Sequence, residues 1–316
     1  MDHREALVAL RQFLSTQILG QERLIERLLI ALLADGHLLV EGAPGLAKTR
    51  AIKELAGGLE AEFHRIQFTP DLLPADITGT EIYRPETGSF VFQQGPIFHN
   101  LVLADEINRA PAKVQSALLE AMAERQVSVG RSTYDLSPLF LVMATQNPIE
   151  QEGTYPLPEA ELDRFMLMLR MDYPQLDEER ALVRQVTRSA RTDTLDISGL
   201  RVLLQAKDVQ ALQKIASEVP LDDQVLDYAV RLARATRDWP GLSLGAGPRA
   251  SIALVRCGRA RALLRGGAFV IPDDIKGCAL AVLRHRVRLS PELDIEGISV
   301  DRLLQQLLDQ VAAPRL

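Results

Sequence analysis

A glycine-rich turn between an apolar run and a helical pattern is the segment of this chain whose residue types most clearly predict chemistry. Residues 38–50 read LLVEGAPGLAKTR. Gly42 and Gly45 would let successive backbone N–H groups converge on phosphate oxygens, and the helix that follows would add the partial positive charge of its N-terminus. Lys48 would reach the β- and γ-phosphates of a nucleotide, and the hydroxyl of Thr49 would ligate Mg²⁺. The segment therefore predicts a phosphate-binding loop.

One position of this loop departs from the pattern G-x-x-x-x-G-K-[ST], because Ala47 stands where a second glycine is expected. Alanine is the smallest replacement, so the turn remains feasible. On its own, the segment is equally compatible with a plain connection from strand to helix in which Lys48 is a solvated helix residue. The predicted contacts with the nucleotide span the whole loop: Gly42, Ala43, Pro44, Gly45, Leu46, Ala47, Lys48, Thr49 and Arg50.

Two adjacent carboxylates follow the apolar run at residues 101–104, where a buried strand would deliver negative charge to a metal–phosphate site. Asp105 would hold Mg²⁺ or one of its waters, and Glu106 would polarise the attacking water. The alternative is a strand that runs out into a solvated acidic turn. The phosphate-binding loop upstream favours the catalytic interpretation.

A third polar group, Asn147, follows the apolar run at residues 139–144. If the strands at 101–104 and 139–144 are neighbours, Asn147 emerges beside Glu106 and would orient the water. The alternative is structural, because Asn-Pro is a common start of a turn.

The elements that must position these residues follow from hydrophobic periodicity. Apolar, β-rich runs occur at residues 38–41, 62–68, 101–104, 139–144 and 165–171. Helical patterns separate most of them, and the clearest is the amphipathic segment 112–125. Strands that alternate with helices and are continuously apolar predict a parallel sheet covered by helices on both faces. Ligands gather at the carboxyl ends of strands in such folds, and all the candidate residues above fall there.

Helical patterns also flank this predicted sheet on both sides. Residues 1–35 predict two helices split at Gly20, and further helices are predicted at residues 176–186, 221–235, 249–264 and 273–284. From about residue 174 the strand signals stop. We therefore expect an α/β core over residues 1–190 and an all-helical second domain over residues 191–316.

Composition is ordinary for a globular protein: 316 residues, 47% hydrophobic, 25% charged, with a net charge of −6. The acidic balance gives no overall attraction to nucleic acid, so none is expected as a partner. The charged N-terminus and the lack of a long apolar run predict a cytoplasmic protein without direct membrane insertion. Cys257 and Cys278 lie in apolar, helix-like surroundings and are expected to be buried free thiols, and no protein-bound transition metal is expected.

As a set, the motifs of this chain resemble the MoxR family of AAA+ ATPases, within the helix-2-insert group. The segments that carry the resemblance are residues 42–49, 103–111, 115–122, 144–148, 157–165 and 247–249. The match runs from about Gly20 to about Arg286, most of the chain. It implies a P-loop NTPase parallel sheet sandwiched by helices, followed by an all-helical AAA+ lid domain.

The resemblance also implies roles for the candidate residues. Lys48 and Thr49 would belong to Walker A and bind phosphate and Mg²⁺. Asp105 and Glu106 would form Walker B, and Asn147 would be sensor 1. The expected cofactors are ATP or ADP with Mg²⁺.

Four further residues acquire a role only through the resemblance. Arg164 looks like an arginine finger that acts on the nucleotide of a neighbouring subunit, so the active form is expected to be a homo-oligomeric ring, a hexamer. The alternative for Arg164 is an ion pair with a nearby carboxylate. Arg249 resembles sensor 2, which reaches the γ-phosphate from the lid. Gly20 and Gln21 match the segment beside the adenine.

Two inserts typical of the helix-2-insert group are also present. Residues 68–79 resemble a family signature, and residues 88–98 alternate as a hairpin would. In related rings such hairpins face the pore or the substrate. Phe90 and Phe92 are therefore either exposed aromatic contacts for a client or side chains packed against the sheet.

The function implied by the resemblance is chaperone-like: ATP hydrolysis would remodel or activate a partner protein that carries a von Willebrand factor A domain, in connection with cofactor or metal insertion. The alternative is a nucleotide-gated assembly switch with slow hydrolysis. A helicase or clamp loader fits the fold but not the acidic balance or the absence of a basic stretch with interleaved aromatic residues.

Overall fold

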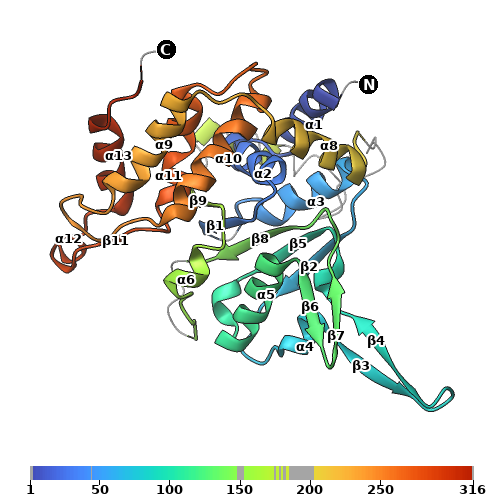
Figure 1. Cartoon of the computed structure of the whole chain (residues 1–316). Helices are drawn as coiled ribbons and strands as arrows, with labels where there is room; N and C mark the ends of the chain where they lie inside the picture. Colours follow the sequence, from blue (N-terminus) through green and yellow to red (C-terminus); the bar gives the residue numbers. More distant parts are fainter. Residues whose placement is uncertain are drawn as a thin grey trace. The chain divides into compact units, whose positions relative to one another are not determined.

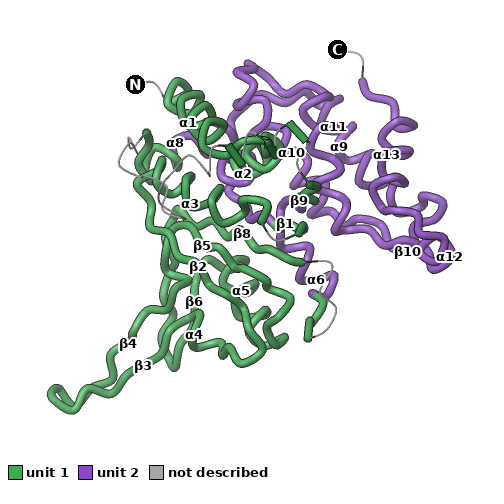
Figure 2. The backbone as a smooth tube through the Cα atoms, turned by 180° about the vertical axis from the view of Figure 1, so that it is seen from behind, with its two compact units in different colours: residues 1–29, 39–156, 169–210 green, residues 30–38, 157–168, 211–316 purple. Residues whose placement is uncertain are grey.

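The structure, a computed structural model, describes residues 3–43, 45–147, 153–173 and 203–314, together with residues 176, 177, 179, 180, 183 and 184. The chain forms two compact units (Figure 2). The first holds residues 1–29, 39–156 and 169–210, and the second holds residues 30–38, 157–168 and 211–316. The predicted boundary between residues 190 and 191 lies outside the described residues.

A five-stranded sheet has the strand order β2-β5-β8-β1-β9 (Figure 1). Its strands are β1 (Leu38–Gly42), β2 (Phe63–Gln67), β5 (Leu101–Asp105), β8 (Leu141–Gln146) and β9 (Leu167–Met171). β2 pairs parallel with β5, and β5 pairs parallel with β8. β5 and β8 are buried up to their last residues, as continuously apolar strands covered on both faces must be. The predicted parallel sheet is confirmed.

The helices that accompany the sheet are α1 (His3–Gln17), α2 (Glu22–Leu33), α3 (Lys48–Gly58), α4 (Pro74–Thr78) and α5 (Ala112–Glu124), with short 3₁₀ turns η1 (Pro96–Phe98) and η2 (Ile107–Arg109). Figure 1 shows α3 and α5 on opposite faces of the sheet. The two N-terminal helices are split as predicted, and Gly20 makes the turn with a φ of 71°. The apolar stripe of α5, which includes Val114, Leu118 and Met122, is buried.

Two antiparallel hairpins extend the first unit beyond the sheet. One pairs β3 (Gly79–Arg84) with β4 (Ser89–Gln94), and Figure 1 shows it reaching away from the sheet. The hairpin expected within residues 88–98 is thus present, with its first strand further upstream. The other pairs β6 (Gln126–Val129) with β7 (Ser132–Asp135) and was not predicted, because its strands are only four residues long and mostly polar.

The second unit is built mainly from helices. The helical elements after β8 are α6 (Glu159–Leu162), α8 (Ala206–Ser217), α9 (Asp223–Ala235), α10 (Pro248–Leu264), α11 (Pro272–Leu283), α12 (Pro291–Ile295) and α13 (Val300–Gln310). Among them, α9, α10, α11 and α13 pack against one another around buried side chains such as Tyr228, Leu254 and Leu304. The helices predicted at 221–235, 249–264 and 273–284 are confirmed, and the described residues of the predicted helix 176–186, namely 176, 177, 179, 180, 183 and 184, are helical.

One small feature of the second unit is not helical. β10 (Leu242–Leu244) and β11 (Arg288–Leu289) form an antiparallel ribbon too short for any alternation to be visible in the sequence. Cys257 on α10 and Cys278 on α11 are buried thiols that form no disulfide, as predicted. Within the described part of the chain, no helix combines the length and the apolar character needed to cross a bilayer.

Candidate functional site

A cavity of about 410 Å³ lies in the first unit, where β5 and β8 end and α3 begins. Its lining residues come from four separate segments of the sequence. They are Gly45, Leu46, Ala47, Lys48, Thr49, Arg50, Arg65, Asp105, Glu106, Thr145, Gln146 and Asn147. Tertiary folding therefore brings together the predicted phosphate loop, the acidic pair and Asn147.

The loop between β1 and α3 places Lys48 at the first residue of the helix. Ala47 adopts the left-handed conformation, with φ 59° and ψ 18°, which a glycine would adopt without strain. The ammonium of Lys48 donates a hydrogen bond to the carbonyl of Gly42 at 2.7 Å. Burial lowers the pKa of Lys48, and the charges of Asp105 and Glu106 oppose this shift. A cation at a helix N-terminus is suited to a phosphate group.

Arg50 also lines the cavity. Its Nε and Nη2 atoms are buried and have no hydrogen-bond partner among the described residues. Burial lowers the pKa of Arg50, and the nearby Glu54 carboxylate opposes the shift. Because a buried donor without an acceptor is unfavourable, a phosphate oxygen is the kind of group that this guanidinium fits.

Asp105 is the last residue of β5, and both of its carboxylate oxygens already accept hydrogen bonds. The buried hydroxyl of Thr145 donates to Oδ1 at 2.5 Å. The guanidinium of Arg65 donates to Oδ2 through Nη2 at 2.6 Å and Nε at 3.1 Å. These contacts hold the carboxylate at the rim of the cavity.

Glu106 also takes the left-handed conformation, with φ 58° and ψ 48°. Its backbone N–H donates to the Thr145 hydroxyl at 2.9 Å, so one threonine binds both members of the acidic pair. Its Oε2 accepts from Gln67 Nε2 at 2.7 Å and lies 3.2 Å from Nε of Arg109. A residue in a sparsely populated conformation, held on several sides, is typical of a functional position.

Asn147 follows β8 by one residue. β8 is the direct neighbour of β5, with Ala144 paired to Ala104, so the condition set in the sequence analysis is met. Asn147 and Glu106 line the same cavity. The predicted placement of Asn147 is confirmed, and its role as sensor 1 stays a prediction.

Other predicted contacts lie away from this lining. Gly42 and Ala43 precede it on β1 and in the turn that follows, and Pro44 is outside the described residues. Gly20 and Gln21 lie in the turn between α1 and α2. Their role beside the adenine stays a prediction.

Four residues of the site escaped the sequence analysis: Arg65, Gln67, Arg109 and Thr145. Arg65 and Gln67 stand two apart on β2, so they share one face of that strand. The sequence shows their spacing, but their contact with the acidic pair depends on the pairing of β2 with β5. That pairing sets Gln67 opposite Asp105. A strand order is not visible in a single sequence.

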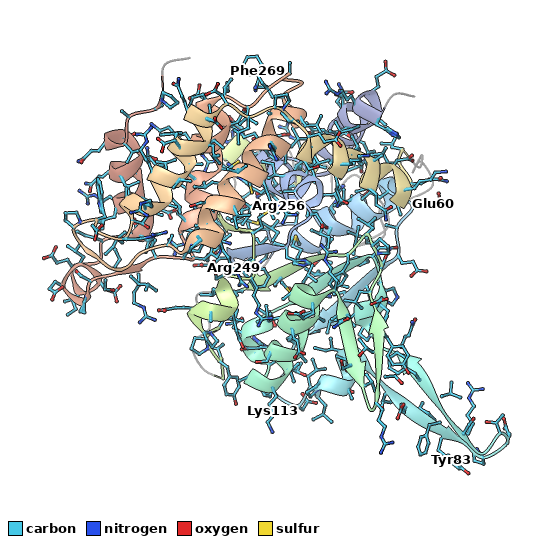
Figure 3. All side chains as sticks on the ribbon, viewed as in Figure 1. Glu60, Tyr83, Lys113, Arg249, Arg256 and Phe269 are labelled. Carbon is cyan, nitrogen blue, oxygen red and sulfur yellow. The ribbon has the colours of Figure 1, made fainter. Side chains whose placement is uncertain are left out.

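Arg164 and Arg249 belong to the second unit. Arg164 is half-buried and follows the short helix α6. Arg249 is the second residue of α10 (Figure 3), and its Nη1 lies 3.8 Å from Oδ2 of Asp163. Asp163 makes a much closer ion pair with Arg286, at 2.6 Å.

The two aromatic residues of the predicted insert have different surroundings. Phe90 is 67% exposed and faces the ring of Tyr83, with centroids 5.3 Å apart, on the β3–β4 hairpin (Figure 3 labels Tyr83). Phe92 stacks on Tyr134 of β7 at 4.0 Å and meets the edge of Phe98 at 5.6 Å. Phe92 is therefore a packing residue between the hairpins, and Phe90 is the exposed one.

The donor set of the cavity fits a nucleotide with Mg²⁺. Lys48 and Arg50 offer cationic donors for phosphate, while the Thr49 hydroxyl and the Asp105 carboxylate are the hard oxygen ligands that Mg²⁺ prefers. A parallel sheet with such a loop after its first strand, acidic residues after a neighbouring strand, and a helical second unit define the AAA+ class of P-loop ATPases.

Comparison with known proteins agrees with this class. A family model described as "ATPase family associated with various cellular activities (AAA)" matches residues 37–167, and an AAA lid domain model matches residues 234–307. Chaperone MoxR1 of Mycobacterium tuberculosis is 44% identical, over 95% of this chain and 80% of its own length. Protein MoxR of Methylorubrum extorquens is 31% identical, over 99% of this chain and 96% of its own length.

A crystal structure of a candidate ATPase from Cytophaga hutchinsonii superposes with a TM-score of 0.90 at 40% identity, covering 99% of this chain and 96% of that one. The identity and coverage of these relatives are sufficient to assign the family. The chain belongs to the MoxR family of AAA+ ATPases.

Proposed function

We propose that this protein hydrolyses ATP in a Mg²⁺-dependent reaction, within a homo-oligomeric ring, to remodel a partner protein. The observation that carries the proposal is the cavity that collects Lys48, Thr49, Asp105, Glu106 and Asn147 from three segments that are far apart in the sequence. These are the groups that phosphoryl transfer to water needs: a phosphate clamp, metal ligands, a polarising carboxylate and a residue that orients the water.

Each residue that lines the cavity would have a separate role in ATP hydrolysis. Lys48 and Arg50 would bind the phosphates, and Thr49 with Asp105 would hold Mg²⁺, which would supply positive charge to offset that of the phosphates. Glu106 would accept a proton from the water that attacks the γ-phosphate. The Thr145 hydroxyl fixes the acidic pair through its hydrogen bonds to Asp105 and to the Glu106 backbone.

We propose that Arg164 is supplied to the nucleotide of the neighbouring subunit and that the ring is a hexamer. A guanidinium placed on the phosphates in trans stabilises the charge of the transition state and is worth about 10³-fold or more in rate. Arg249, at the start of α10, is proposed to reach the γ-phosphate as sensor 2. Gly20 and Gln21 are proposed to contact the adenine.

The proposed partner is a protein with a von Willebrand factor A domain, and the proposed outcome is cofactor or metal insertion in the cytoplasm. Two observations support remodelling rather than hydrolysis alone. A relative carries the name "Chaperone MoxR1". The β3–β4 hairpin exposes Ile82, Tyr83, Phe90 and Val91, an apolar surface that hydrolysis does not require.

The test measures nucleotide binding and Mg²⁺-dependent phosphate release. Lys48→Ala should abolish binding or hydrolysis, whereas Lys53→Ala, on an exposed position of the same helix, should leave both unchanged. Glu106→Gln should bind ATP but turn over poorly, and the ATP-bound variant should retain the partner. Wild-type nucleotide affinity in Lys48→Ala would refute the site. Failure of Glu106→Gln to retain any protein with a von Willebrand factor A domain would refute the partner.

A second candidate function is a nucleotide-gated assembly switch with slow hydrolysis. The contacts of Glu106 favour it, because Gln67 and Arg109 already occupy a carboxylate oxygen that would otherwise accept from the attacking water. Turnover that a partner stimulates supports the remodelling enzyme. Turnover that no partner changes, with assembly that depends on nucleotide, supports the switch.

A further inference from the structure

Arg286 is a buried cation of the second unit with an extensive set of hydrogen bonds. Its side chain is 3% exposed and makes five hydrogen bonds. Nε donates to Oδ1 of Asp163 at 2.6 Å, and Nη2 donates to the carbonyl of Phe165 at 2.6 Å. Nη1 donates to the carbonyl of Met166 at 3.1 Å and to that of Val282, on α11, at 2.5 Å.

His285 reinforces the same contact from the preceding position. It is buried, and its Nε2 lies 3.0 Å from the Phe165 carbonyl oxygen. Burial, helped by the charge of Arg286, lowers the pKa of His285 well below its ordinary value, so the ring is neutral. Because a carbonyl oxygen can only accept a hydrogen bond, Nε2 must carry the proton of the neutral ring. Its N–H then donates a hydrogen bond to the Phe165 carbonyl.

These bonds surround a single residue of the sequence. His285 and Arg286, which follow α11, donate hydrogen bonds to Asp163, Phe165 and Met166. The residue between Asp163 and Phe165 is Arg164. The side chain of Phe165 is fully buried, so the turn is held by packing as well as by polar contacts. The backbone of Arg164 is consequently fixed on both sides.

A buried guanidinium is an unusual choice for a contact that serves only to stabilise the fold. Taking a guanidinium out of water is unfavourable, and apolar residues of similar size hold a helix end at least as well. A guanidinium differs from them in geometry, because its planar set of five N–H donors can bind a carboxylate and several carbonyls at once. Arg286 therefore supplies orientation rather than net stability.

We propose that Arg286, with His285, is a positioning residue that holds Arg164 in the orientation needed to act on a neighbouring subunit's nucleotide. This inference rests on the proposed trans action of Arg164. It assigns a role in hydrolysis to a residue that is remote in sequence from every nucleotide-binding motif. In this role Arg286 would act through Arg164 and not on the nucleotide itself.

The test uses mixed rings. An Arg286→Gln subunit keeps its own cavity residues but presents a displaced Arg164, and a Glu106→Gln subunit has an inactive cavity but an intact Arg164. Alone, Arg286→Gln should lose about 10²-fold in rate, as expected for a misplaced catalytic group. An equimolar mixture should recover about a quarter of the wild-type rate, because one junction in four then joins a working cavity to a well-placed Arg164.

Two controls separate this role from a general loss of structure. Arg265→Gln removes a comparable clamp in the same unit, because Arg265 binds the buried carboxylate of Asp274 and the carbonyl of Phe269. That variant should lower the melting temperature without loss of rate per folded subunit. Arg164→Ala mixed with Glu106→Gln should recover activity in the same way as Arg286→Gln.

The outcomes distinguish the inference from the function on which it rests. If the Arg164→Ala mixture fails to recover, the proposed trans action is wrong. If it recovers and the Arg286→Gln mixture does not, the positioning role is overturned. Should Arg286→Gln not fold, Arg286→Lys replaces it, since lysine keeps the charge beside Asp163 but lacks the planar fork. A folded Arg286→Lys variant with the wild-type rate would likewise overturn the inference.

Discussion

Ala47 carries backbone strain at the point where the phosphate loop turns into α3. A residue with a Cβ in the left-handed region is disfavoured by about 1–2 kcal/mol, and glycine is not. The loop nevertheless forms, because alanine is small and the rest of the turn is compatible with it. The departure from the usual glycine is therefore tolerated rather than disabling.

Ala47→Gly should relieve this strain. We expect a gain of about 0.5–1 kcal/mol in the free energy of unfolding, after allowance for the greater freedom of glycine in the unfolded chain. Thermal unfolding should show a melting temperature about 1–3 °C higher, with nucleotide binding retained.

The matched control for this change is Ala51→Gly, a buried position in the first turn of α3. There the backbone is helical, and glycine should lower stability by about 1 kcal/mol. A loss of stability in Ala47→Gly equal to that in Ala51→Gly would contradict the strain argument.

Arg65 shares the carboxylate that is proposed to bind Mg²⁺. Its guanidinium donates two hydrogen bonds to Oδ2 of Asp105 and thus competes with a metal for that oxygen. Arg65→Ala should reduce the Mg²⁺ concentration needed for half-maximal hydrolysis by about two- to fivefold, the range for a half-exposed ion pair. A titration of activity with MgCl₂ measures this shift.

Arg170 provides the comparison, because it pairs with Glu41 on β1, which does not line the cavity. Arg170→Ala should leave the Mg²⁺ requirement unchanged. A higher requirement in Arg65→Ala would mean that Arg65 assists the metal site rather than competing with it.

At the scale of elements, the β3–β4 hairpin is attached to the rest of its unit through aromatic packing. Phe92 stacks on Tyr134 of β7, and β3 contacts β6. Sheets of only two strands are marginally stable by themselves, so each hairpin depends on such contacts.

Phe92→Ala should loosen the β3–β4 hairpin. Loss of an aromatic pair worth about 0.5–1.5 kcal/mol should speed amide exchange in residues 79–94 about three- to tenfold. Hydrogen exchange followed by mass spectrometry resolves this segment from the sheet. Gln93→Ala, at an exposed position on the same strand, is the control and should change exchange little; equal effects of the two would refute the packing role.

At the scale of the whole molecule, proposed catalysis between subunits makes activity depend on assembly. The rate per subunit should rise with protein concentration until rings are complete, and Arg164→Ala should lose about 10³-fold or more. Phosphate release over a dilution series checks both. Arg164 is not the finger if the rate per subunit stays constant on dilution and if Arg164→Ala does not change the rate, including in mixtures with Glu106→Gln.

Much of the architecture was predictable because its signals are local. Continuous apolar runs mark the strands of a covered parallel sheet, and the phosphate loop and acidic pair sit directly after two of them. Short elements were not predictable in this way. β6, β7, β10 and β11 have two to four residues each, which is too few for a period to show.

The sequence by itself determined the class of chemistry, since Lys48, Thr49, Asp105 and Glu106 lie in contiguous motifs whose residue types suit phosphate and Mg²⁺. Only the tertiary structure decided which other groups hold them. Thr145 meets Asp105 from 40 residues away, and Arg286 reaches Asp163 across 123 residues. The physical reason is that such contacts arise from strand order and helix packing, which depend on the whole chain and not on any local pattern.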